Sequence, residues 1–148
     1  MSSDTGRPPQ RLDTPASSGY SVAAQISKDI VKLLSSYTGR GPTKARTTLN
    51  TNFATVLLED ALTKAERNLV AAGEHDSVRR QRSLFNRLMR DEAVAIVERA
   101  TSRRVRAFLS DLSPETDVAL FAFVFDPRPE TGEVSVAEAK GDGDAGVT

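Results

Sequence analysis

The chain has 148 residues, enough for one domain with a single hydrophobic core. Its 20 basic and 20 acidic residues balance, so no net charge draws the whole protein towards nucleic acid or an anionic membrane. It has no cysteine and only one histidine, His75, which excludes disulfides, thiolate chemistry and any site that needs several imidazoles from one chain.

The first segment, residues 1–19, is rich in Ser, Pro, Gly, Asp and Thr and is predicted to be a disordered leader because it has little apolar surface to bury. A helical stripe follows, with Ser21 as a candidate N-cap. The stripe consists of Val22, Ile26, Ile30, Val31, Leu33 and Leu34. The helix is expected to run to about Tyr37 and to end at Gly39.

The turn after this helix, Gly39–Lys44, is the best candidate site in the sequence. Its two glycines permit positive φ, and Pro42 stiffens it. Consecutive free N–H groups in such a turn can bind an anion, and the Arg40 and Lys44 charges would strengthen that binding. The candidate ligands of a small anion such as phosphate, carboxylate or bicarbonate are Gly39, Arg40, Gly41, Thr43 and Lys44. The alternative is a turn that only ends the helix, with solvated charges.

Two strands are predicted next. Lys44–Leu49 alternates small or apolar residues with charged or hydroxylated ones, and residues 50–52 read as a tight hairpin connection. The returning strand, Phe53–Leu58, is apolar on both faces, which predicts an inner strand.

Two helices are expected after the hairpin. Thr63 and Glu66 form a capping box at the start of a short helix that Gly73 ends. A single longer helix is predicted over residues 76–101. Glu92 falls near the centre of its apolar stripe, so we expect Glu92 to pair with Arg46 or Arg104.

The last two predicted strands cover residues 104–110 and 117–125, with a loop over 111–116. The remainder, residues 127–148, reads as a disordered acidic tail. The order is helix, two strands, two helices, two strands. It predicts a single α+β domain over residues 20–126, with helices packed on a mainly antiparallel four-stranded sheet.

The final strand has two apolar faces, and helices on one side of the sheet cannot cover the other. If the helices cover the face that carries Val105, Leu109, Leu120 and Val124, the other face presents an aromatic patch large enough to require a partner. The patch would consist of Phe108, Phe121, Phe123 and Phe125. A homodimer through these phenylalanines is therefore expected. The alternative is that the first helix crosses to the phenylalanine side and closes a monomer.

An arginine-rich stretch raises a second function. Residues 79–106 hold nine arginines and three acidic residues, which is the composition of a nucleic-acid-binding surface or of a solvated helix face. Few aromatics accompany the arginines and no known motif is present, so no specific nucleic-acid target is expected. An enzyme that uses Glu59, Asp60 or Glu92 with Arg40 is a third alternative. No acid and base stand at a diagnostic spacing, so neither catalytic residues nor a cofactor or metal are expected.

The sequence has no run of about 20 apolar residues that could span a bilayer, and its first residues lack the apolar core of a signal peptide. A cytoplasmic protein without direct membrane insertion is expected.

Several segments, in this order, resemble the MpsC-like family, which is named for a sodium-translocating, membrane-potential-generating system. They are Gly39–Lys44 (GRGPTK), Leu58–Glu66 (LEDALTKAE), and Ile96–Glu98 leading into Arg104–Val105 and Phe108–Asp111. The resemblance covers Gln25–Phe125, and similar chains carry Thr-Gly where this one has Thr101 and Ser102. It implies a small cytoplasmic accessory of cation or inorganic-carbon transport, with a membrane-transport protein as a partner. It supplies no catalytic residue.

Overall fold

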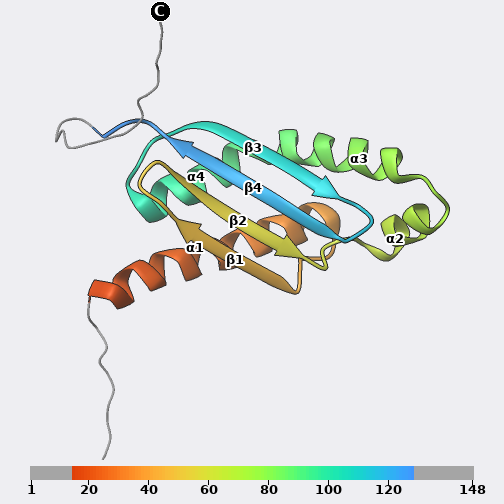
Figure 1. Ribbon diagram of the computed structural model, residues 1–148, viewed down its shortest axis with the longest axis horizontal. Helices are drawn as coiled ribbons and strands as arrows, with labels where there is room; N and C mark the ends of the chain where they lie inside the picture. The colour runs from red at the N-terminus through yellow and green to blue at the C-terminus, as the bar shows by residue number, and fades with distance from the viewer. Residues whose placement is uncertain (1–14, 129–148) are drawn as a thin grey trace, which may run out of the picture.

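The computed structural model describes residues 15–128 of the protein, with side chains from Ser21 onwards. Figure 1 shows one sheet with helices behind it. The elements are α1 (Pro15–Thr38), β1 (Lys44–Leu49), β2 (Phe53–Glu59), α2 (Lys64–Ala71), α3 (His75–Leu88), α4 (Arg90–Thr101), β3 (Val105–Ser113) and β4 (Val118–Phe125). The predicted α+β class is confirmed, and so is the order of the elements, except that three helices rather than two lie between β2 and β3.

Two boundaries at the ends of the chain bear on the predicted domain limits. Helix α1 begins at Pro15, inside the segment 1–19 that was expected to be a disordered leader. The rest of that leader (residues 1–14) and nearly all of the predicted acidic tail (residues 129–148) lie outside the described residues.

The four strands form one antiparallel sheet in the order β1-β2-β4-β3. The two hairpins β1–β2 and β3–β4 therefore lie side by side, and β2 pairs with β4 along its whole length from Phe53↔Val124 to Glu59↔Val118. Because β2 and β4 are the inner strands, both carry long apolar runs, as was predicted for β2.

One core lies between the sheet and the helices α1 and α4. Its buried side chains from the helices are Ile26, Ile30, Leu33, Leu34, Met89, Ala93, Ile96 and Val97. Those from the sheet are Ala54, Val56, Leu58, Phe121, Phe123 and Phe125. A smaller cluster of Leu62, Val78 and Leu112 packs beneath α2 and α3. The helices thus share one face of the sheet, and the strands in Figure 1 present the other face to the viewer.

The phenylalanines lie on the helix-covered face, which reverses the premise of the predicted interface. Phe121, Phe123 and Phe125 are buried, and Phe108 packs edge-on against Phe121 with ring centroids 5.2 Å apart. Helix α1 lies on the phenylalanine side, as the alternative required, but α4 packs there too, so the described helices leave the opposite face uncovered. The predicted alternation of β3 is also broken by a register shift between Val105 and Ala107, which turns Val105 towards the core.

The single long helix predicted over residues 76–101 is wrong. Met89 has φ −98° and ψ 5°, so it ends α3 and begins α4 in one residue. After this break Glu92 is exposed and accepts a hydrogen bond from the Tyr37 hydroxyl, which raises the pKa of Tyr37. The partners expected for Glu92, Arg46 and Arg104, do not contact it.

Strand β3 is also longer than predicted. It extends through Ser113, so residues 111–113 belong to the ladder and the turn is confined to residues 114–117. The polar residues Ser110 and Asp111 are common both in edge strands and in loops, so the sequence did not indicate that the strand continues through them.

Candidate functional site

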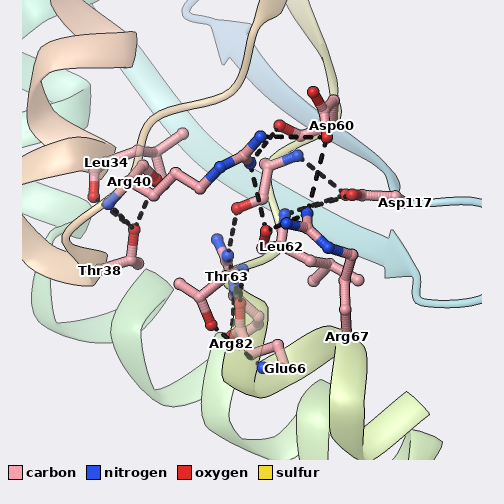
Figure 2. Close-up of polar contacts among 11 residues, drawn as sticks. Leu34, Thr38, Arg40, Asp60, Leu62, Thr63, Glu66, Arg67, Arg82 and Asp117 are labelled. Carbon is pink, nitrogen blue, oxygen red and sulfur yellow. Dashed lines mark hydrogen bonds and ion pairs between the residues drawn. The ribbon is translucent and has the colours of Figure 1, made fainter. Parts of the chain in front are cut away.

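The segment that follows β2, residues 60–63, is held almost entirely by charged side chains (Figure 2). Asp60 begins it with φ 59°, a left-handed conformation, and its amide donates to the Asp117 carbonyl at 3.1 Å. The amides of Ala61 and Leu62 donate to the Asp117 carboxylate at 2.9 and 3.1 Å. The Thr63 amide donates to Glu66 at 2.8 Å. The Asp117 carboxylate, just before β4, and the Glu66 carboxylate of α2 therefore accept hydrogen bonds from the backbone amides of residues 61–63.

Arginines from three places satisfy the carbonyl groups of the same segment. Arg40 donates to the Asp60 carbonyl at 2.6 Å and to that of Leu62 at 3.2 Å. Arg67 donates to the Leu62 carbonyl at 2.7 Å, and Arg82 reaches the Ala61 carbonyl at 2.7 Å. Because a charged donor forms a stronger hydrogen bond than a neutral one, the segment is locked between the helices and the sheet.

The candidate anion turn contacts a carboxylate of the chain itself. Arg40 pairs with the Asp60 carboxylate at 3.2 Å, and the Thr43 hydroxyl donates to it at 2.9 Å. The Thr43 hydrogen bond and the Arg40 charge lower the pKa of Asp60. Lys44 lies 4.0 Å from Glu59. Binding of a free anion here stays a prediction, and such an anion would have to compete with Asp60.

The two glycines of this turn have different tasks. Gly39 has φ 84°, and its amide donates to the Ser35 carbonyl at 2.8 Å, so it ends α1 as predicted. A Cβ on Gly41 would stand 3.0 Å from a Val31 methyl and 3.1 Å from the Val31 carbonyl oxygen. Gly41 therefore allows the turn to pass close to α1.

The buried ion pair between Glu66 and Arg82 was not predicted. The guanidinium donates to both carboxylate oxygens, at 2.8 and 2.7 Å. The capping box of Thr63 and Glu66 is confirmed, so the same carboxylate also serves the start of α2. One signal was present in the sequence: Arg82 follows Val78 by four residues and thus lies on the apolar stripe of α3.

The residues named for an enzyme are only partly brought together. Asp60 lies against Arg40, whereas Glu92 pairs with Tyr37 between α1 and α4. Within residues 15–128 no group of three or more His, Asp or Glu side chains is arranged to hold a metal ion.

The nine arginines of residues 79–106 do not share one surface. Arg82 is buried, Arg79 donates to the Leu112 carbonyl, and Arg103 donates to two carbonyls and stacks on the Phe125 ring at 4.6 Å. They are spread over helices α3 and α4, the connection that follows α4, and strand β3. Several of these charges therefore hold the fold together.

A groove of about 590 Å³ runs between α1 and β1 beside the candidate turn. Its walls include Pro42 and Thr43 from the turn, and it is also lined by Lys28, Lys32 and Arg46. In the described part of the chain, no carboxylate lies within 4.0 Å of these three cations as an ion-pair partner.

The sheet surface that faces away from the helices is called the open face here. Alternation along the paired strands assigns it Lys44, Arg46, Thr48, Phe53, Thr55, Leu57, Glu59, Ala107, Leu109, Asp111, Ser113, Val118, Leu120, Ala122 and Val124. Three large apolar side chains on it are exposed: Leu109 by 59%, Leu120 by 44% and Phe53 by 40%. None of the described helices covers this face.

A comparison with protein families matches residues 19–127 to the model of the family described as "Na+-translocating membrane potential-generating system (MpsC)". The match covers more than half of the chain. The chain belongs to the MpsC family. The matched range of this MpsC-family domain includes residues 60–63, the Gly39–Lys44 turn and the whole sheet.

No curated protein and no solved structure matches the chain. None of the helices described in this MpsC-family domain is both long and apolar enough to cross a membrane.

Proposed function

We propose that this MpsC-family domain is a cytoplasmic, non-enzymatic accessory of a sodium-translocating, membrane-potential-generating system, and that it works by binding protein through the open face. The observation that carries the proposal is this apolar sheet surface on a domain of that family. Monomeric proteins rarely leave a contiguous apolar patch of several hundred Å² uncovered, so such a face is typical of a binding surface.

The polar network supports the same proposal. The carboxylates of Asp60, Glu66 and Asp117 all serve the backbone or the arginines around residues 60–63. Groups used in this way stabilise a fold rather than carry out acid–base chemistry, which needs a group free to exchange a proton. The link to this transport system comes from the family description, and a membrane-transport protein as a further partner is proposed from that link alone.

Deletion of the gene tests the proposal in cells that naturally carry it. The sodium-dependent part of the membrane potential, followed with a voltage-sensitive dye, should fall on deletion and return with the wild-type gene. Leu120→Asp should not restore it, whereas Leu84→Asp, on the exposed side of α3, should. An unchanged sodium-dependent potential after deletion would contradict the proposal.

Weak binding of a small anion is a second candidate function, and the groove between α1 and β1 is its best location. The turn cations Arg40 and Lys44 lie near carboxylates, whereas Lys28, Lys32 and Arg46 line the groove without such a partner among the described residues. We propose phosphate or bicarbonate as the ligand class, since the Lys28 and Lys32 cations of α1 can approach its oxygens.

Amide chemical shifts recorded during a phosphate or bicarbonate titration test this candidate. The shifts of residues that line the groove should move, and Lys28→Ala together with Lys32→Ala should remove the response. Arg40→Ala tests the original turn: loss of the response in that variant alone would place the anion at Arg40. Unmoved shifts at high anion concentration would end the proposal.

A further inference from the structure

The open face is apolar in the middle and charged at its two edges. Its centre is formed by the inner strands, where Leu57 of β2 pairs with Leu120 of β4. The same row of the ladder ends in Arg46 on β1 and in Asp111 on β3. The row therefore reads cation, two leucines, anion across the sheet.

The neighbouring rows continue this pattern. Thr48, Thr55, Ala122 and Leu109 form one of them, and Phe53 and Val124 lie beyond it on the inner strands. Beyond the Arg46 row, Lys44 of β1 lies 4.0 Å from Glu59 of β2, so these two charges offset each other. Arg46 thus stands at one edge of the open face, and the exposed Asp111 carboxylate, which lies 3.6 Å from Arg79 of α3, stands at the opposite edge.

We propose that the open face binds the open face of a second copy of this chain, with a two-fold axis parallel to the strands. Two sheets stacked face to face lie about 10 Å apart, with their strands nearly aligned. A two-fold axis in that plane and parallel to the strands places β1 of one copy over β3 of the other. Rows are kept in register, so Arg46 of each copy faces Asp111 of the other, and Leu57 faces Leu120.

The charges select this axis over the other one that lies in the plane. A two-fold axis perpendicular to the strands would place β1 over β1 and bring the Arg46 edges of both copies together. Like charges that face each other across an interface disfavour that arrangement. The axis parallel to the strands replaces that repulsion with two ion pairs and keeps the apolar centre matched to itself.

A second copy fits this surface because it is self-complementary, which is the defining requirement of a two-fold interface. An unrelated protein would need the reverse order of charges on a flat apolar face of the same width. Specific interfaces bury about 800 Å² on each partner, and a face that is only four strands wide is small beside that area. A dimer with a dissociation constant in the micromolar range is therefore expected.

Sedimentation equilibrium of the full chain tests the pairing. At concentrations of tens of micromolar the wild type should approach twice the 16.0 kDa mass of one chain. Leu109→Asp and Leu120→Asp should sediment as monomers and keep their far-ultraviolet circular dichroism, because both positions are exposed. Leu84→Asp and Leu88→Asp remove exposed leucines of α3 outside the open face and should stay dimeric.

Charge exchange tests the axis independently of the apolar centre. Arg46→Asp and Asp111→Arg should each raise the dissociation constant roughly tenfold or more, since each replaces two attractions with two repulsions. The double variant Arg46→Asp with Asp111→Arg should return close to the wild-type value. A wild-type chain that stays at 16.0 kDa at these concentrations overturns the proposal, and so does a double variant no tighter than the single ones.

The inference builds on the open face named in the proposed function, yet the two can fail separately. A monomeric wild type combined with loss of the sodium-dependent potential in Leu120→Asp would leave the open face as a site for another protein and refute the dimer. A dimer that Leu120→Asp dissociates, in cells whose potential does not respond to deletion, would refute the transport role and support the pairing.

Discussion

Glu66 performs two tasks with one carboxylate, because it completes the cap of α2 and neutralises the buried Arg82. Removal of Arg82 would leave this carboxylate buried without its cation, and breaking such a pair typically costs about 3–5 kcal/mol. We expect Arg82→Leu to lower the free energy of unfolding by that amount in urea denaturation. Arg80→Leu, two residues away on the exposed side of α3, should change it by less than about 0.5 kcal/mol. Equal effects of the two substitutions would contradict this account.

The same carboxylate makes stability depend on pH. Burial of Glu66 opposes ionisation, but hydrogen bonds from Arg82 and the Thr63 amide outweigh it, so the pKa of Glu66 lies below its ordinary 4.5. A lowered pKa in the folded state means that the stabilisation is complete above pH 4.5 and is lost as the pH falls through the folded-state pKa. The difference in unfolding free energy between wild type and Glu66→Gln should therefore shrink from about pH 7 to about pH 3. A constant difference would show that Glu66 is not ionised in the folded state.

The turn between α1 and β1 depends on Gly39 for its conformation and on Gly41 for space. Gly39→Ala places a side chain at φ 84° with nothing within 4 Å, so it should cost about 1–2 kcal/mol, and Gly39→Asn should cost less. Gly41→Ala forces a Cβ against Val31 and should cost about 1–3 kcal/mol, with no relief from Asn. Thermal unfolding of the four variants checks this contrast. Relief by Asn at both glycines would mean that conformation alone decides.

The arginines of α3, α4 and β3 give a prediction for nucleic acid. Since they lie on separate elements and several are occupied by protein groups, we expect only backbone electrostatics, with no preferred sequence. Binding of an oligonucleotide, followed by fluorescence anisotropy, should fall steeply as salt rises and should be equal for scrambled sequences. Tight binding of one defined oligonucleotide at physiological salt would favour the nucleic-acid alternative instead.

Local patterns predicted the elements with strong start and stop signals. Three such signals are the capping box at Thr63, the glycine after α1 and the alternation in β1. Each depends on residues only a few positions apart, so each can be recognised in the sequence alone. The break at Met89 has no such signal, because no glycine or proline lies near it. The break is determined by packing, because α4 packs into the core whereas α3 lies along the edge strand β3.

At the scale of the whole molecule, the face that the helices cover decides where the protein can bind. Both faces of β4 are apolar in sequence, so periodicity could not choose between them. The register shift in β3 and the buried Arg82 depend on contacts between distant segments, which no local pattern reports. The end of α1 at Gly39 was predicted, but the Asp60 carboxylate that Arg40 contacts lies 20 residues further along the chain.

The absence of cysteine from the chain allows the pairing of two open faces to be tested by cross-linking at chosen positions. The central claim is best tested with Arg46→Cys and Asp111→Cys, made as separate proteins, mixed and treated with a short thiol-specific bismaleimide, because facing sheets about 10 Å apart hold the two thiols too far apart for a direct disulfide. The account predicts a covalent dimer in the mixture and little in either protein alone, because position 46 of one copy faces position 111 of the other. Leu84→Cys mixed with Asp111→Cys is the matched control and should stay uncrosslinked. A control mixture that cross-links as fast as the test mixture, or a test mixture that yields no covalent dimer, would contradict it.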